Sequence, residues 1–260
     1  NVIKGFLNLE LGDTAWLSEV EALRGHYAAQ PAQAWRTANG QGIKVLVEYS
    51  SPNTNKPLHL GHLRNNFLGD SVCRLLNQAG FEVVRANLIN DRGIHICKSM
   101  LAWQLYGDGQ TPETTRQKGD HFVGDYYVRF EQELRAQASP LLEAWLSGAE
   151  TPEHPEAQKL QQAYQAAEDE DKKQGVADKL KEHARNAAPL MAQARKMLQD
   201  WEQGDTAVVD LWKTMNGWVL DGFRASYARM GVHFDQFYYE SDTYLLGKEL
   251  VEKGLANKLF

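Results

Sequence analysis

The stretch Val45-Leu-Val-Glu-Tyr-Ser-Ser-Pro-Asn-Thr-Asn-Lys-Pro-Leu-His-Leu-Gly-His62 decides how this sequence folds. It begins with apolar, β-branched residues that suit a buried strand, and the strand stops at Ser-Ser-Pro-Asn. A polar loop follows and ends at His-Leu-Gly-His, which leads directly into a helical pattern. This order of strand, loop and helix N-terminus predicts a site for nucleotide phosphates, because the first N–H groups of a helix attract anions.

The residues that follow predict a βαβ unit. Apolar residues recur at helical spacing after the histidines, and Gly80 stands where a helix C-terminus favours glycine. The expected elements are a buried parallel strand over 43–49, an amphipathic helix over 61–79, a second strand over 81–89, a turn over 90–93 and a helix over about 94–106. We therefore predict an α/β fold with a Rossmann-like parallel sheet flanked by helices.

The rest of the chain favours helices. Residues 107–205 are rich in Gln, Ala, Glu and Lys and indicate a helical insertion, with breaks expected at Pro140, Pro152 and Pro155. The other expected elements are a strand over 1–11, a helix over 13–24, a long helix ending at Gly231, a strand over 232–240 and a helix over 244–253. The expected organisation is the end of one domain over 1–25, a linker over 26–42, and an α/β domain formed by 43–106 and 206–260.

The composition limits the class of protein. Its 260 residues are 43% apolar, which is enough for one large domain or two small ones. No run of ~18 apolar residues suggests a membrane span, and two cysteines on regular segments favour a reducing compartment. A net charge of -6 gives no general attraction to nucleic acid. We expect a cytoplasmic monomer that does not bind membranes. Without an initiator Met or a signal peptide, the chain is expected to begin inside a longer protein.

The loop collects groups that suit phosphate chemistry. His59, His62 and Lys56 can hold triphosphate charge and stabilise the extra charge on a pentacoordinate phosphorus. Gly61 has no side chain, so a flat base can lie against the backbone. From the residues alone, an ordinary solvated lysine at position 56 is an equally good interpretation.

Two further residues predict a second ligand group at the same edge. Glu48 and Asn53 follow the first strand, and a doubly wound sheet binds its ligand outside the carboxyl ends of its strands. A carboxylate suits a cationic group, and an Asn amide both donates and accepts hydrogen bonds. A strand-end cap or an ion pair with a neighbouring Arg is the alternative for Glu48.

These residues resemble a known family. The run Glu48-Tyr-Ser-Ser-Pro-Asn-Thr-Asn-Lys-Pro-Leu-His-Leu-Gly-His-Leu-Arg64 is similar to the signature of arginyl-tRNA synthetases, which are class I aminoacyl-tRNA synthetases. The runs Tyr227-Ala-Arg-Met-Gly-Val-His-Phe-Asp235 and Tyr239-Glu-Ser-Asp242 also resemble the family. The resemblance covers most of 43–106 and 207–260. It implies a class I catalytic core that is truncated after its first half, and a tRNA-contacting domain that ends within 1–25.

The resemblance also implies a role for the phosphate-loop residues. His59 and His62 would contact the phosphates of ATP, which binds together with Mg²⁺ and without a protein metal site, and Gly61 would lie under the adenine. Lys56 would replace the lysine of a degenerate K-M-S-K-S loop located after Phe260. His59, His62 and Lys56 are therefore the expected catalytic groups.

The implied reaction is the ligation of L-arginine to its tRNA. Glu48 and Asn53 would bind L-arginine, which attacks the α-phosphate of ATP to give arginyl-adenylate. The arginyl group is then transferred to the terminal ribose of tRNA(Arg). The truncated chain alone is expected to be inactive. In this scheme no protein nucleophile is needed, and alignment and charge stabilisation carry the catalysis.

Two other functions and one departure stand beside this hypothesis. Small nucleotidyltransferases also use H-x-G-H, usually within the first ~20 residues of a compact domain, and a synthetase-like module could bind RNA or an amino acid without activating it. The turn Asn90-Asp91-Arg92-Gly93 replaces the Gly-Asp-Trp-Gly of many relatives, which puts a carried-over role for it in doubt.

His95, Cys97 and Cys73 lack C-x-x-C spacing, so helix packing is favoured over a metal site.

Overall fold

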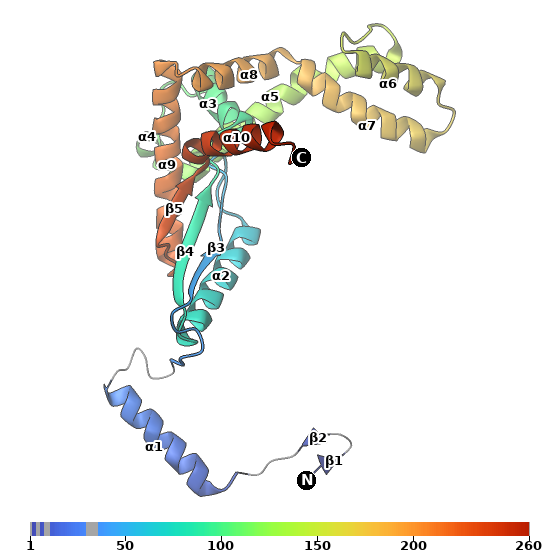
Figure 1. Cartoon of the computed structure of the whole chain (residues 1–260). Coiled ribbons are helices and arrows are strands. Elements are labelled where there is room, and N and C mark those ends of the chain that lie inside the picture. The colour runs from blue at the N-terminus through green and yellow to red at the C-terminus, as the bar shows by residue number, and fades with distance from the viewer. Residues whose placement is uncertain (1, 4–5, 8–10, 30–35, 260) are drawn as a thin grey trace.

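The computed structural model describes residues 2–3, 6–7, 11–29 and 36–259. Figure 1 shows α2 lying along a small sheet, with a group of helices beyond one end of that sheet. In chain order the elements are β1 (Val2–Ile3), β2 (Phe6–Leu7), α1 (Asp13–Ala29), β3 (Lys44–Glu48), α2 (Leu60–Gln78), β4 (Glu82–Ile89), α3 (Ile94–Tyr106), α4 (Pro112–Thr115), α5 (Gly119–Ser147), α6 (Pro155–Ala166), α7 (Glu170–Ala187), α8 (Pro189–Glu202), α9 (Thr206–Met230), β5 (Gln236–Tyr239) and α10 (Glu240–Ala256).

The sheet that positions the site is parallel, with strand order β3-β4-β5. Val45 pairs with Val83 on one side of β4, and Phe237 pairs with Asn87 on the other side. β5 is reached only after the long helical region, yet it joins the same sheet as the first βαβ unit. The predicted α/β fold with a parallel sheet flanked by helices is confirmed.

The prediction that the first strand is buried is wrong. Residues along β3 alternate between exposed and half-buried, and Leu46 is 55% exposed. In the described part of the chain β3 lies at the edge of its sheet and pairs only with β4. Because successive side chains of a strand point to opposite faces, a strand covered on one face shows this alternation even when its residues are apolar.

The first helix of the unit confirms the predicted span but not the expected orientation of its apolar face. α2 buries Asn66, Asp70 and Cys73, whose spacing of four and three residues forms one stripe. The large apolar side chains of α2 are exposed instead: Leu60, Phe67, Leu68, Val72 and Leu75. The buried stripe of α2 therefore consists of two polar residues and a cysteine, and Cys73 packs against Tyr49 and Val232.

The main core lies among α3, α5, α8 and α9, beyond the carboxyl ends of the strands. Its fully buried large side chains include Met100, Phe130, Met215 and Phe223. α5 and α9 approach closely, because a Cβ added to Gly222 would lie 2.5 Å from Oδ1 of the buried Asp120. This core fixes the position of α9, which in turn leads into β5.

The helical region 107–205 matches the predicted helical character except at one proline. Pro152 lies in the loop before α6, and Pro155 is the first residue of α6, where a missing N–H costs least. Pro140 was expected to break the helix, but it lies inside α5. Buried Ala138 and Trp145 on either side pack into a second core cluster, and this packing maintains the helix through the lost hydrogen bond.

The ends of the described chain differ from prediction in their bounds. α1 runs to Ala29, so the first residues of the expected linker are helical, and 30–35 lie outside the described residues. The expected strand over 1–11 is an antiparallel pair, β1 and β2, in its described parts. α9 ends as predicted at Gly231, which has a φ of 67°. β5 is shorter and α10 longer than expected. Among the described residues, none of the helices combines the length and apolar character that crossing a bilayer requires.

The close approach of α5 and α9 can be tested with two glycines of the same helix. Gly222→Ala should destabilise the fold by about 1–3 kcal/mol, because the new methyl group collides with Asp120. Gly217→Ala is the control: its Cβ meets nothing within 4 Å, so the higher helix propensity of alanine should stabilise the fold by about 0.5–1 kcal/mol. Chemical denaturation followed by circular dichroism measures both. Equal effects at the two positions would contradict the close α5–α9 packing.

Candidate active site

The sequence-predicted site residues gather at the carboxyl ends of β3 and β4. The chain leaves β3 after Glu48, touches the sheet again at Asn53 and reaches α2 after His59. The connecting loop is held against the helical region, because Leu58 packs on the main core and a Cβ at Gly124 of α5 would lie 2.7 Å from Cδ of Pro57. The loop is thus fixed between the sheet and α5.

The two histidines form a capping box at the N-terminus of α2. The N–H of Gly61 donates to Nδ1 of His59 at 3.1 Å, and the N–H of His59 donates to Nδ1 of His62 at 3.2 Å. The ring centroids are 4.0 Å apart. Because each Nδ1 accepts a backbone hydrogen bond, the neutral form of each ring has its proton on Nε2. Two Nε2–H donors therefore lie beside the positive end of a helix, which suits an anion.

Gly61 is required by the histidine pair itself. A Cβ at this position would lie 2.9 Å from Cε1 of His59. Any larger residue would therefore displace the ring that caps the helix. The sequence prediction gave Gly61 a role under a flat base, and the geometry adds a packing role within the protein.

Lys56 lies close enough to influence the titration of the site. The pKa of His62 is lowered from 6.5, first by burial and then by the positive charges of His59 and Lys56. The pKa of His95 on α3 is also lowered, first by burial, with a contribution from Lys56. The half-buried Lys56 thus contributes a cation to the same corner as the two histidines.

The turn between the two predicted arginine-binding residues is strained. Ser50 and Ser51 have φ values of 72° and 43°, a left-handed conformation that is uncommon outside glycine. Each such residue costs about 1–3 kcal/mol and persists only where its surroundings over-determine it. The side chains of Asn65 and Asn87 accept hydrogen bonds from the two serine N–H groups, at 2.7 and 3.1 Å respectively.

The same turn orients Glu48. Oγ of Ser51 donates to Oε1 of Glu48 at 2.8 Å and accepts from the N–H of Leu88 at 3.3 Å. The Glu48 side chain is thereby tied to the end of β4, while the residue stays exposed. The carboxylate is available to a cationic ligand at the sheet edge.

Asn53 is placed on the sheet. It forms an isolated parallel bridge with Asn90, in which the N–H of Asn90 donates to the carbonyl of Pro52 and the N–H of Thr54 donates to the carbonyl of Asn90. Asn53 is half-buried, five residues beyond Glu48 along the chain. The structure therefore brings the predicted anion-binding and cation-binding residues to one edge of the sheet.

Sequence reasoning missed the role of the turn over 90–93. The buried Asp91 carboxylate accepts from the N–H and the hydroxyl of Ser241, at 2.9 and 2.6 Å. The backbone carbonyl of Asp91 accepts hydrogen bonds from Nε1 of Trp212 and Nδ2 of Asn216, both on α9. Burial raises the pKa of Asp91, and the Ser241 hydrogen bonds oppose this effect. The polarity of the turn between apolar segments was the available signal, but its partners lie more than 100 residues away.

The cysteines lie apart on different helices and serve packing. Cys73 on α2 and Cys97 on α3 are both buried and free. Burial raises the pKa of the Cys97 thiol to about 12, which disfavours the thiolate. Nδ1 of His95 contacts the Tyr127 hydroxyl at 3.1 Å. The described part of the chain has no group of three or more His, Cys, Asp or Glu residues arranged to hold a metal ion.

A partly buried ion cluster joins α3, α5 and α7. Lys98 of α3 donates to Glu131 of α5 at 2.9 Å, and Arg185 of α7 binds the other carboxylate oxygen. Burial alone would raise the pKa of Glu131, but the hydrogen bonds from Lys98 and Arg185 outweigh it and lower the pKa. The cluster fixes α5 and α7 to the helix that follows the second strand.

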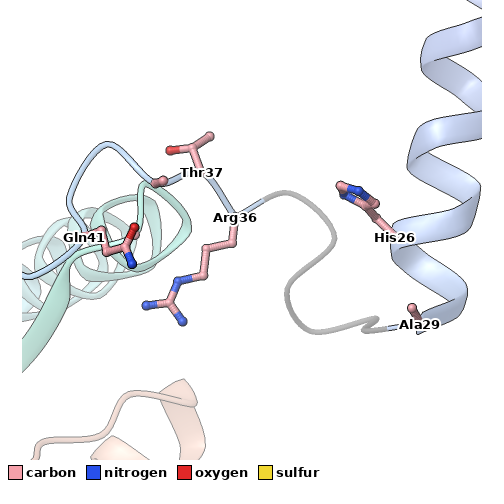
Figure 2. A pocket seen from close by; sticks show the side chains of 7 residues that line it. His26, Ala29, Arg36, Thr37 and Gln41 are labelled. Atoms are coloured by element: carbon pink, nitrogen blue, oxygen red, sulfur yellow. The ribbon is translucent and has the colours of Figure 1, made fainter.

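A separate hollow lies at the other end of the sheet. His26 and Ala29 of α1 face Arg36, Thr37 and Gln41 across it, as Figure 2 shows. Its volume is about 510 Å³, and Gly80, which precedes β4, also lines it. Because β3 and β4 begin at this end and the histidines lie at their carboxyl ends, the hollow is not part of the histidine site.

Part of the chain matches the model of a known family. Residues 28–137 match the model of the family described as "tRNA synthetases class I (R), catalytic domain". The matched range includes β3, the loop that ends at His59, α2 with His62, β4 and α3. It also extends into α5.

Comparison with individual proteins agrees. The chain is 47% identical to an arginine–tRNA ligase of Porphyromonas gingivalis over 259 residues, and 47% identical to one of Amoebophilus asiaticus over 262 residues. Both matches cover 100% of this chain and 37% of the relative, so the chain spans little more than a third of the length of these relatives. The structure resembles Thermus thermophilus arginyl-tRNA synthetase with a TM-score of 0.52 and 25% identity, over 91% of this chain and 29% of that one.

The titration of His62 tests the geometry of the histidine pair. By NMR we expect the pKa of His62 to lie below 6.5. Lys56→Gln should raise this pKa without restoring it to 6.5, because burial lowers it more than Lys56 does. Near and below pH 6.5 the unfolded chain binds more protons at His62 than the folded chain does. The contribution of His62 to folding stability therefore falls as the pH is lowered through that range. A midpoint at or above 6.5 in the unmodified protein would contradict this arrangement.

Proposed function

Because the chain belongs to the arginine–tRNA ligase family, through a segment of its class I catalytic domain, we propose that it forms the part of the enzyme that binds ATP and L-arginine. The full reaction activates L-arginine to arginyl-adenylate and transfers the arginyl group to tRNA(Arg). The observation that carries the proposal is the histidine pair, whose Nδ1 atoms are engaged by the backbone and whose Nε2–H groups serve as donors at a helix N-terminus.

The proposed chemistry is charge stabilisation during adenylate formation. The arginine carboxylate attacks the α-phosphorus of ATP, a P–O bond forms, and the bond to the leaving pyrophosphate breaks. His59 and His62 donate to phosphate oxygens as charge accumulates on the pentacoordinate phosphorus, and Lys56 adds a full positive charge. Mg²⁺ bound to ATP would neutralise further phosphate charge. The lowered pKa of His62 supports a neutral hydrogen-bond donor near pH 7.

The arginine end of the substrate is assigned to Glu48 and Asn53. The Glu48 carboxylate, fixed by Ser51, suits a cationic group of arginine. Asn53 offers an amide on the adjacent loop, where it can both donate and accept. The separation of cationic residues from Glu48 across one loop supports a ligand with an anionic and a cationic end.

The same proposal assigns the remaining segments. Residues 1–25 would end a tRNA-contacting domain, 26–42 would link it to the catalytic domain, and 107–205 would be a helical insertion between the catalytic segments 43–106 and 206–260. We propose that the enzyme acts as a cytoplasmic monomer. The segment alone, at 37% of the length of its relatives, should not arginylate tRNA.

Amino-acid-dependent exchange of pyrophosphate into ATP tests the proposed reaction directly. The full-length protein is assayed with tRNA and each amino acid in turn, and arginine should be the only substrate. Exchange with another amino acid would contradict the arginine assignment. Absence of exchange, together with retained binding of ATP, would instead favour a binding module.

Lys56 has a matched control for its proposed role. Lys56→Ala should lower kcat for arginylation by about 10²-fold, with little change in the KM for arginine, because the lost charge acts on the transition state. Lys44→Ala removes a lysine from the start of β3, where it pairs with Glu82 and is 65% exposed, and should leave kcat unchanged. Equal kinetic effects of the two substitutions would remove Lys56 from the catalytic site.

A further inference from the structure

The Tyr227 hydroxyl of α9 contacts the strained serine turn. It lies 2.7 Å from Oγ of Ser50 and accepts a hydrogen bond from Nδ2 of Asn87 at 3.2 Å. Tyr227 is 5% exposed and Asn87 is fully buried, so both are held in place by their surroundings. The hydroxyl connects α9 to a turn that lies 177 residues earlier in the chain.

The contacts of Asn87 depend on that hydroxyl. Oδ1 of Asn87 accepts from the N–H of Ser51, so the amide group must donate through Nδ2. Tyr227 accepts this hydrogen bond and thereby fixes which way the amide points. A chain of contacts therefore runs from Tyr227 through Asn87 to the Ser51 backbone, and from the Ser51 hydroxyl to Glu48.

The conformation of the turn determines where Glu48 points. Ser50 and Ser51 both need a positive φ, and relaxing either one would move the Ser51 hydroxyl away from Glu48. Burial raises the pKa of Tyr227, which keeps its hydroxyl protonated over the working pH range. The hydroxyl is therefore a permanent hydrogen-bonding group behind the turn and does not itself reach the substrate edge.

We propose that Tyr227 is a positioning residue for the amino-acid substrate, which maintains the left-handed Ser50–Ser51 turn through Asn87 and so orients the Glu48 carboxylate. This role rests on the proposed function, because it needs Glu48 to bind the cationic group of arginine. α9, the helix that follows the helical insertion, thus helps to determine the affinity for arginine at the edge around Glu48.

The deletion of one oxygen atom tests this role. In the full-length protein, Tyr227→Phe should raise the KM for arginine about tenfold in tRNA-dependent exchange, since a hydrogen bond that fixes a charged group is lost. The KM for ATP should change less than about twofold, because the histidine pair is not attached to Tyr227. Tyr126→Phe on α5, where the tyrosine is half-buried, is the control and should change neither constant.

A second substitution separates positioning from general loss of structure. Glycine adopts a positive φ without strain, so Ser50→Gly in the Tyr227→Phe background should recover most of the lost arginine affinity. Failure of this rescue, with an unchanged melting temperature, would overturn the proposal, as would an equal rise of both KM values.

A crystal structure of the Tyr227→Phe variant makes the test independent of activity. We expect the φ values of Ser50 and Ser51 to relax and the Ser51–Glu48 hydrogen bond to break. Retention of both would overturn the positioning role even if the protein is active with arginine. Absence of arginine-dependent exchange in the unmodified protein would instead refute the proposed function, and the crystal structure would still decide the role of Tyr227.

Discussion

The site depends on how the chain leaves β3. It must turn through two left-handed serines and return to the sheet at Asn53, where the pairing with β4 resumes. This detour interrupts the hydrogen-bonded pairing with β4 and creates the edge at which Glu48, Asn53 and the following loop meet. Because a left-handed serine is unfavourable by itself, the detour exists only through the side chains that hold it. Those side chains come from α2, β4 and α9.

The helical region and the sheet are therefore parts of one arrangement around this edge. α9 supplies Tyr227 to the turn and Trp212 to the carbonyl of Asp91, and it leads directly to β5. Arg92, next to Asp91, lies over the ring of Tyr244 in α10 and forms an ion pair with Glu202 in α8. Each of these contacts joins the carboxyl end of a strand to a helix from the second half of the chain.

Local sequence patterns predicted the elements well where the hydrophobic periodicity ends at a residue that is typical of an element boundary. The span of α3 and the end of α9 at Gly231 were correct within a residue, because a glycine or polar turn stands at each boundary. The patterns failed where tertiary packing decides. Pro140 continues a helix because its flanks are buried, and the apolar residues of α2 are exposed while its buried stripe consists of two polar residues and a cysteine.

Some residues of the candidate site could be identified from the local sequence, and the roles of others depend on contacts with distant segments. The histidines and Lys56 could be found from sequence because strand, loop and helix are contiguous. The roles of Asn65, Asn87 and Tyr227 could not, because they depend on hydrogen bonds to a backbone conformation that no residue pattern predicts for serine. Asn87 and Tyr227 lie within segments that resemble the family, but a resemblance does not identify what a side chain contacts.

A crystal structure of the full-length protein with a non-hydrolysable arginyl-adenylate analogue would show whether the histidine pair and Glu48 contact opposite ends of one ligand. We expect Nε2 of His59 and of His62 to lie within hydrogen-bonding distance of the phosphate or ribose side of the analogue, and the Glu48 carboxylate to contact a cationic group of the arginyl moiety. Binding of the analogue elsewhere, or an arginyl group distant from Glu48, would contradict this expectation.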